Sequence, residues 1–304
     1  PSQASACAKM PANAERKASS RSASPARTTS SKASVDFHDR TVCRYGATSA
    51  TVFEGAETGA LSSASEIAPA VERLRATFDS DKTLSLAWRV AQLQAMRRMI
   101  TEGRDELCEA MRIDLHKSAF EGVVTELSVL GGEIDKALAH LRSWMKPTYT
   151  DSSALNIPCW SYTQRDPLGV VLVMGAWNYP TLLTLGPVVG AIAGGNCVVI
   201  KPGAYARASS HSIARLVLKY MDAACVAVAE GDRTVTAALL EQRFDKICFT
   251  GSGYVGKIVA AAAAKHLTPC LLELGGKSPC IVDRSADVAH AAKRFVRVRV
   301  RVRV

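Results

Sequence analysis

A glycine-rich loop is the stretch of this chain whose residue types and spacing most clearly suggest chemistry. An apolar run ends at Thr250, and Gly251, Gly253 and Gly256 then lead into an alanine-rich segment typical of a helix. This is the pattern GxGxxG between a strand and a helix. In it the glycines let a pyrophosphate approach the backbone, and the helix N-terminus supplies N–H donors. The loop therefore predicts a dinucleotide-binding site.

Two other interpretations of this loop stay open. Followed by Lys257, it nearly matches the P-loop of nucleoside triphosphatases, but Ile258 stands where a hydroxyl should reach Mg²⁺, which disfavours that class. A simple turn that joins a strand to a helix would need no ligand at all. If the dinucleotide pattern holds, it also assigns Glu273, at the end of the next apolar run, to the ribose hydroxyls.

The elements that must position the loop alternate regularly from Val170 onward. Helix-like segments separate the short apolar runs VVLVMG, CVVIK, CVAVA, KICFT, CLLEL and CIVD. This alternation predicts βαβ units, and hence a parallel sheet with helices on both faces. We therefore expect the α/β fold class, as a three-layer α/β/α Rossmann-type nucleotide-binding domain.

Helices are expected ahead of this sheet. Apolar residues recur at three- and four-residue spacing in a helix capped by Ser65, in a second stretch over 84–115 and in a third over 123–144. Polar residues and prolines then interrupt the pattern over residues 150–169. We expect this segment to form an extended arm or a hairpin.

The chain divides into three regions by composition. Residues 1–64 form a tail, of which residues 1–34 are rich in Ser, Ala, Lys and Arg and fit either an organellar transit peptide or a disordered segment. Residues 65–294 form the nucleotide-binding domain. In residues 295–304 valine alternates with arginine, which is typical of a strand. A short repeated DNA tract would encode the same pattern, so we expect this tail to be artefactual.

The charge of the chain gives little support to a nucleic-acid partner, and we expect none. The net charge is +10, but between the basic segments at residues 1–50 and 293–304 the body holds 24 basic against 25 acidic residues. A neutral body is not a surface that neutralises phosphates.

Cysteine spacing and hydropathy suggest a compartment. The nine cysteines show neither CxxC nor metal-ligand spacing, which predicts free thiols, no metal and a reducing compartment. We expect the cytoplasm, or a plastid or mitochondrion if the first residues are a transit peptide. No apolar run reaches about 18 residues, so no membrane segment is expected.

Three segments, read together, resemble the aldehyde dehydrogenase superfamily, and most closely its class 3 branch, which acts on fatty and aromatic aldehydes. They are PLGVVLVMGAWNYPTLLTLGPVVGAIAGGNCVVIKP (167–202), FTGSGYVGKIVAAAAAKHLTP (249–269) and LELGGKSPCIVD (272–283), and weaker similarity runs back through DLHKS. The resemblance implies NAD(P)-dependent oxidation of aldehydes to carboxylic acids, and a homodimer for the intact family member.

The resemblance implies two catalytic roles. The Asn of the WNYP motif, Asn178, would donate a hydrogen bond to the oxyanion of a cysteine adduct, and the Glu of ELGG, Glu273, would act as general base on the thioester. Burial at the end of an apolar strand would raise the pKa of Glu273. Taken alone, Asn178 could make a turn before Pro180, and Glu273 could pair with Lys277.

The resemblance also implies a cofactor site for NAD or NADP. Lys201 would bind the adenosine ribose, and the other cofactor-binding residues would be Trp177, Gly251, Ser252, Gly256 and Leu274. Taken alone, Lys201 would be a solvated lysine at a strand end. Family members often carry Ser-Glu where this chain has Gly203 and Ala204, and the missing carboxylate predicts relaxed choice between NAD and NADP with weaker binding.

The catalytic cysteine of the family lies in a GQxC motif that the resemblance places beyond residue 304. Cys270 and Cys280 flank Glu273, but both are expected in apolar strands, where thiols are usually inert. We therefore expect an incomplete domain and an inactive fragment. The alternative is a non-catalytic remnant that binds nucleotide or dimerises with an intact paralogue.

Overall fold

The computed structural model describes the backbone of residues 59–156 and 158–301, and the side chains of residues 59–155 and 158–294. The first described residues lie beside the main sheet. Leu61 donates its N–H to the Val228 carbonyl at 2.8 Å and accepts from the Glu230 N–H at 2.9 Å, forming a parallel bridge. The fold thus begins ahead of the predicted boundary at residue 65. The rest of the predicted N-terminal tail lies outside the described residues.

Helices precede the sheet, as predicted. They are α1 (Ala64–Asp79), α2 (Leu86–Glu102), α3 (Arg104–Leu115), α4 (Ala119–Gly122), the π-helical turn η2 (Val123–Leu127) and α5 (Ser128–Trp144).

Two details of these helices differ from the prediction. The N-cap of α1 is Ser63 rather than Ser65, because Glu66 stands three residues after Ser63 and accepts its backbone N–H at 2.8 Å in a capping box. The stretch over 84–115 is two helices, since Gly103 ends α2 and begins α3. A Cβ at Gly103 would lie 2.7 Å from the Leu216 side chain and 2.7 Å from the Met99 carbonyl oxygen, so a larger residue at this break would force its neighbours to shift.

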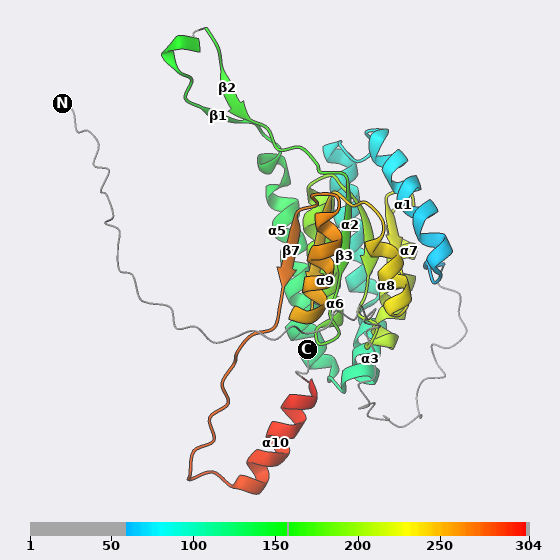
Figure 1. The fold of residues 1–304 in the computed structure, drawn as a ribbon, viewed down its shortest axis with the longest axis vertical. Helices are drawn as coiled ribbons and strands as arrows, with labels where there is room; N and C mark the ends of the chain where they lie inside the picture. Colours follow the sequence, from blue (N-terminus) through cyan, green and yellow to red (C-terminus); the bar gives the residue numbers. More distant parts are fainter. Residues whose placement is uncertain (1–58, 157, 302–304) are drawn as a thin grey trace, which may run out of the picture. The chain divides into compact units, whose positions relative to one another are not determined.

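The segment after α5 folds as the predicted hairpin. Strands β1 (Thr148–Thr150) and β2 (Ser161–Thr163) pair antiparallel, with Thr148 opposite Thr163, and a 3₁₀ turn, η3 (Ala154–Asn156), lies between them. The two strands form a sheet of their own, apart from the main sheet (Figure 1).

The main sheet is fully parallel and has the order β5-β4-β3-β6-β7. Its strands are β3 (Val170–Met174), β4 (Cys197–Lys201), β5 (Val226–Val228), β6 (Lys246–Thr250) and β7 (Cys270–Glu273), and the intervening helices are α6 (Pro180–Ala193), α7 (Arg207–Tyr220), α8 (Arg233–Leu240) and α9 (Gly253–Ala264). The predicted sixth strand over 280–283 is wrong. These residues are exposed and irregular, because β7 is an edge strand with no further strand beside it among the described residues.

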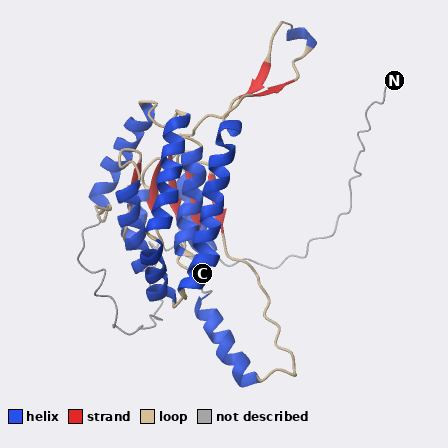
Figure 2. Cartoon of the chain, turned by 180° about the vertical axis from the view of Figure 1, so that it is seen from behind, coloured by secondary structure: helices blue, strands red, loops and turns tan. Residues whose placement is uncertain are grey.

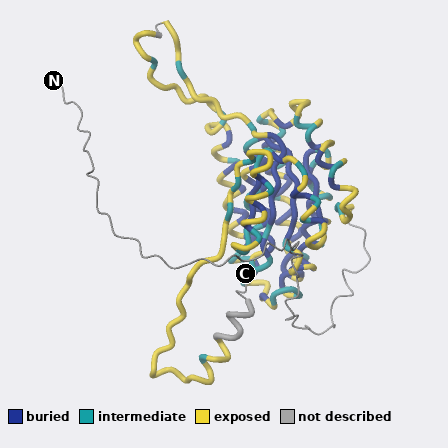
Figure 3. The backbone as a smooth tube through the Cα atoms, in the orientation of Figure 1, coloured by how far each residue is buried: buried dark blue, intermediate teal, exposed yellow. Residues whose placement is uncertain are grey.

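Helices cover both faces of the sheet, which confirms the predicted α/β/α layers. Helices α6 and α7 pack on one face, with α2, α3 and α5 against them, and α1, α8 and α9 lie on the other. Figure 2 shows helices in front of the strands. All residues of β3 and β4 are buried, as expected for central parallel strands, and the buried part of the chain follows the sheet (Figure 3).

The last described element is a helix, α10 (Val288–Arg301), so the strand predicted from valine-arginine alternation is wrong for residues 295–301. A strand needs a partner for its backbone N–H and C=O groups, whereas a helix satisfies them internally. Among the described helices, none combines the length and the apolarity needed to cross a membrane.

Candidate functional site

The carboxyl ends of β3 and β6 form the topological switch point of the sheet. From β3 the chain adds β4 and β5 on one side and later adds β6 and β7 on the other, so the loops after β3 and β6 diverge. In open α/β sheets ligands bind in the crevice at this point. A ligand is therefore expected beside the loop over 175–179 and the loop over 251–252.

The loop after β3 is held tightly at its start. The Gly175 N–H donates to the Lys201 carbonyl at 2.9 Å, and a Cβ at Gly175 would lie 2.0 Å from the hydroxyl of Thr184 in α6. Trp177 and Asn178 are half-buried and follow directly. The loop thus presents these two predicted site residues at the edge of the sheet.

Lys201 ends β4 beside this loop and is buried, with 4% of its surface exposed. Its ammonium donates to the Pro202 carbonyl at 2.9 Å. Burial lowers the pKa of Lys201 to about 8, and the charges of Asp232 and Glu230 partly oppose that shift. The alternative of a solvated strand-end lysine is therefore wrong.

Gly203, one of the two departures from the family pattern, packs under the same loop. A Cβ at this position would lie 3.0 Å from the backbone N of Trp177 and 3.0 Å from the carbonyl carbon of Ala176. Any other residue would press on the loop that carries Asn178. The neighbouring Ala204 is exposed.

The glycine loop joins β6, α9 and β7. The Gly251 N–H donates to the Glu273 carbonyl at 3.0 Å, and the Ser252 hydroxyl accepts the Val255 N–H at 3.3 Å as the N-cap of α9. A Cβ at Gly256 would lie 2.8 Å from a methyl of Leu274, so this glycine permits close packing of α9 on the end of β7. Four of the predicted cofactor residues and Glu273 therefore lie together.

Carboxylates already occupy the N-termini of three of the four helices that connect strands of the main sheet. Glu126 caps α6, Asp114 caps α7 and Asp232 caps α8, each accepting first-turn N–H groups at 2.7 to 3.2 Å. A further anion there would face a like charge. The cap of α9 is the neutral hydroxyl of Ser252. Among these helices, α9 is thus the one suited to a pyrophosphate.

The capping roles of Asp114 and Glu126 were not predicted from the sequence. The sequence does indicate that such caps are needed, because the N-cap residues of α6 and α7 are Tyr179 and Ala206, and neither makes a side-chain capping bond. Helix starts without a local cap indicate that a distant group satisfies the first-turn amides.

Glu273 is the last residue of β7 and lies opposite Thr250, at the end of the strand as predicted. Its side chain is exposed, so the expected burial is wrong for the described chain: β7 alternates half-buried and exposed residues as the edge strand. Among the described residues, Glu273 forms no ion pair with Lys277.

The cysteines flanking Glu273 differ from each other. Burial raises the pKa of Cys270 in β7, as expected for an inert thiol. Cys280 is exposed and lies outside any strand, so that part of the prediction is wrong. Cys108, Cys197, Cys225 and Cys248 are buried free thiols. Within the described part of the chain, no group of three or more His, Cys, Asp or Glu residues could hold a metal ion.

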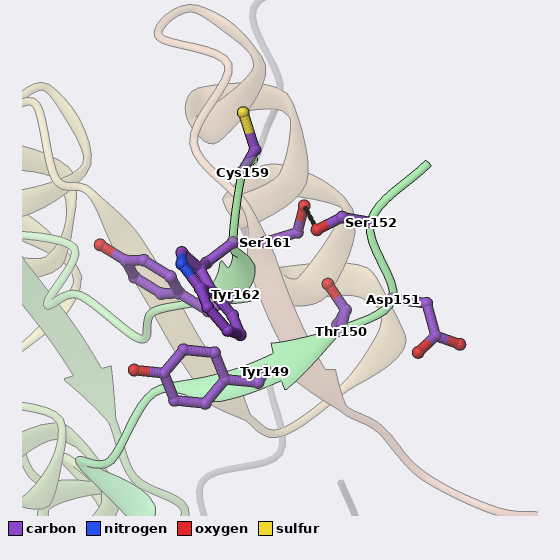
Figure 4. A pocket seen from close by; sticks show the side chains of 8 residues that line it. Tyr149, Thr150, Asp151, Ser152, Cys159, Ser161 and Tyr162 are labelled. Atoms are coloured by element: carbon purple, nitrogen blue, oxygen red, sulfur yellow. Dashed lines mark hydrogen bonds between the residues drawn. The ribbon is translucent and has the colours of Figure 1, made fainter. Parts of the chain in front are cut away.

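A cavity of about 860 Å³ lies on the hairpin, lined by residues 149–152 and 159–162. Figure 4 shows Tyr149 and Tyr162 side by side and the hydrogen bond between Ser152 and Ser161. The lining includes none of the predicted site residues. Because the glycine loop and the half-buried Asn178 lie elsewhere, this cavity is not the candidate site.

The known proteins to which this chain is similar in sequence are aldehyde dehydrogenases. The model of the aldehyde dehydrogenase family matches residues 51–302. Aldehyde dehydrogenase family 3 member B1 of Rattus norvegicus is 46% identical over 224 residues, covering 74% of this chain and 48% of the relative. The chloroplastic aldehyde dehydrogenase family 3 member I1 of Arabidopsis thaliana is 41% identical over 266 residues, covering 88% of this chain and 48% of the relative. The chain spans about half the length of the curated relatives it matches.

Solved structures share the fold. The substrate-bound state of Staphylococcus aureus AldH superposes with a TM-score of 0.69 at 35% identity, covering 77% of this chain and 51% of that one. PnpE in complex with nicotinamide adenine dinucleotide gives a TM-score of 0.65 at 26% identity, covering 77% and 48%.

Proposed function

This chain belongs to the aldehyde dehydrogenase family, and we propose that it forms the cofactor-binding part of an enzyme that oxidises aldehydes to carboxylic acids with NAD or NADP. The observation that carries the proposal is the N-terminus of α9. It is capped by a neutral hydroxyl while carboxylates cap the other three helices that connect strands of the main sheet, and it lies beside Glu273 at the switch point.

The residues present fit a dinucleotide. A Cβ at Gly253, the first residue of α9, would meet nothing within 4 Å, so a pyrophosphate has room to approach the backbone. Gly251, Ser252 and Gly256 would hold the pyrophosphate, Lys201 the adenosine ribose, and Trp177 and Leu274 would flank the nucleotide. When bound, the nicotinamide accepts the hydride that leaves the aldehyde carbon.

Two residues of this chain are proposed to act on the aldehyde. The Asn178 side-chain amide donates to the oxyanion that forms when a thiolate attacks the carbonyl carbon. The Glu273 carboxylate takes a proton from the water that hydrolyses the thioester. Asn178 follows β3 and Glu273 ends β7, and these parallel strands end at the same edge of the sheet, since β3 and β7 flank β6.

We propose that the nucleophile is none of Cys108, Cys159, Cys248 and Cys270. Burial raises the pKa of Cys108, Cys248 and Cys270, which keeps these thiols protonated near neutral pH. The exposed Cys159 lies on the hairpin, apart from the main sheet. As the family resemblance implies, a thiol of the complete protein that lies beyond residue 304 would complete the site.

A charge placed at the start of α9 tests the cofactor site. In the variant Ser252→Asp the capping oxygen is kept, because Asp caps helices as well as Ser, but its charge repels a pyrophosphate. We expect the affinity for NAD, measured by calorimetry on the purified chain at pH 7, to fall about tenfold or more.

The control is Ser85→Asp, the same change at the N-cap of α2, where the Ser85 hydroxyl accepts the Trp88 N–H at 3.1 Å. This variant should bind NAD like the unmodified chain. The proposal fails if Ser252→Asp binds NAD unchanged, or if both variants lose affinity equally.

Glu230 is expected to influence the choice between NAD and NADP. Gly203 and Ala204 predict relaxed choice, but the charge of Glu230 acts on Lys201, and a 2′-phosphate near this lysine would be repelled. The Glu230→Gln variant can still accept the Ser210 hydroxyl bond, which is 3.3 Å long. We expect it to shift the ratio of the NADP and NAD dissociation constants several-fold toward NADP.

Titration of both cofactors into the unmodified chain and Glu230→Gln measures that shift. Glu241→Gln is the matched control, since Glu241 is exposed and pairs with Lys265 at 3.1 Å. An unchanged ratio in Glu230→Gln would mean that Glu230 plays no part in the choice.

Partner and compartment are also proposed. We propose that the enzyme is a homodimer acting on a small-molecule aldehyde, as its family resemblance implies, and that the exposed Tyr149, Trp160 and Tyr162 of the hairpin are available for subunit contact. The free thiols favour a reducing compartment, for which we propose the cytoplasm, or a plastid or mitochondrion.

A further inference from the structure

A buried ion pair stands behind the loop that carries Asn178. The Lys117 ammonium lies 2.6 Å from a carboxylate oxygen of Glu126, and the two side chains are only 7% and 0% exposed. Removing both charges from water is costly, and buried pairs of this kind add little net stability over apolar residues of similar volume. The pair therefore requires an explanation other than stability.

Glu126 holds the start of α6. Its second carboxylate oxygen accepts the N–H groups of Thr181 at 2.8 Å and Leu182 at 3.1 Å. These are first-turn amides that the N-cap residue, Tyr179, does not satisfy with its side chain. Glu126 thus supplies the missing cap from another helix, and a negative charge at this N-terminus is favoured by the helix dipole.

Lys117 holds the residues just before α6. Its ammonium donates to the Asn178 carbonyl at 3.2 Å and lies 3.9 Å from the centre of the Tyr179 ring, a cation–π contact. Lys117 therefore fixes the two residues before Pro180, while Glu126 fixes the two residues after it. The pair thus restrains the backbone on both sides of Pro180, including that of Asn178.

Local backbone departures bring the pair together. Glu126 lies in the π-helical turn η2, where the wider turn interrupts a continuous α-helix between α4 and α5. Lys117 follows His116, which ends α3 in the left-handed region with φ of 55°. Such departures are uncommon for ordinary residues and frequently mark functional positions.

We propose that Lys117 and Glu126 are positioning residues that hold Asn178 in the geometry needed to donate to the oxyanion. This inference rests on the proposed function, in which Asn178 is that donor. The oxyanion donor must be preorganised, because even a small displacement of a catalytic group costs a large part of its effect. A charged pair with hydrogen bonds to Asn178, Thr181 and Leu182 and a cation–π contact with Tyr179 limits that displacement more than apolar packing does.

Fluorine NMR of the purified chain labelled with 5-fluorotryptophan tests the inference. The chain has four tryptophans, and Trp177 adjoins Asn178, so its resonance, identified with Trp177→Phe, reports the loop position. In Lys117→Met we expect the Trp177 resonance to shift by more than its line width while the other three stay in place. Lys117→Arg, which keeps the charge, should restore most of the original shift.

Lys219→Met is the matched control, because Lys219 also lies over a tyrosine ring, at 4.9 Å from the centre of Tyr220, but on α7. Its Trp177 resonance should be unchanged. If Lys117→Met fails to fold, the double variant Lys117→Met with Glu126→Leu replaces the pair by apolar residues. We expect this variant to unfold at a lower urea concentration than the unmodified chain, because the Thr181 and Leu182 N–H groups lose their acceptor, and still to show the displaced Trp177 resonance.

An unshifted Trp177 resonance in the folded Lys117→Met or double variant would overturn the inference. Binding of NAD separates this outcome from failure of the proposed function. If the unmodified chain binds NAD and Ser252→Asp does not, but the Trp177 resonance of Lys117→Met is unshifted, the cofactor site is supported and the positioning role of the pair is wrong. If the resonance moves but NAD does not bind, the pair holds the loop and the proposed function fails.

Discussion

A methyl group at Gly175 is expected to destabilise the chain by about 1–3 kcal/mol, because it overpacks the junction of β3 and α6. The added Cβ would lie 2.0 Å from the hydroxyl oxygen of Thr184 and 3.0 Å from its Cα. Rotation of the Thr184 side chain relieves only the first contact. The backbone of α6 must move as well, and the bond from the Gly175 N–H to the Lys201 carbonyl is strained.

Urea unfolding of Gly175→Ala measures this cost. The control is Gly190→Ala in α6, the helix that carries Thr184, where a Cβ would meet nothing within 4 Å. Since alanine is the better helix former, the control should gain about 0.5–1 kcal/mol. Opposite signs for two identical substitutions are the expected result, and equal stability of the two variants would contradict the packing seen at Gly175.

Replacing Lys201 by Met is expected to stabilise the chain near neutral pH while weakening NAD binding. Burial lowers the pKa of this lysine from 10.5 to about 8, which corresponds to a penalty of roughly 3 kcal/mol for keeping it charged. The Pro202 carbonyl loses its donor, which costs roughly 1 kcal/mol in return. A net gain of about 1–3 kcal/mol should remain. A buried charge that lowers stability is expected at a residue whose charge is needed for binding.

The pH dependence identifies the cause. Above about pH 8 the folded chain releases the Lys201 proton, whereas the unfolded chain keeps it up to about 10.5. The contribution of this group to the stability of the unmodified chain therefore rises with pH between these values, and Lys201→Met lacks that rise. The difference in free energy of unfolding between Lys201→Met and the unmodified chain, measured with urea, should be large at pH 7 and small at pH 9.5. A gap of equal size at both pH values would exclude a buried charge as its cause.

Short-range features of the chain could be predicted from its sequence. The runs VVLVMG, CVVIK, CVAVA, KICFT and CLLEL form strands, and the segment over 150–169 lies within or beside a hairpin. Each depends on residues a few positions apart. Two errors came from the edge of the sheet: Glu273 was expected to be buried, and residues 280–283 were expected to form a strand. Apolar composition does not reveal whether another strand lies alongside.

The sequence by itself determined the strand-turn-helix order and the glycine loop, because periodicity and the backbone freedom of glycine are local properties. The tertiary structure alone decided which helix N-terminus is left for an anion. Glu126 reaches amides 55 and 56 residues away, and Asp114 reaches amides 94 and 95 residues away. Hydrogen bonds and helix dipoles act over a few ångströms in space, so a carboxylate far along the chain can occupy one helix and leave α9 to a ligand.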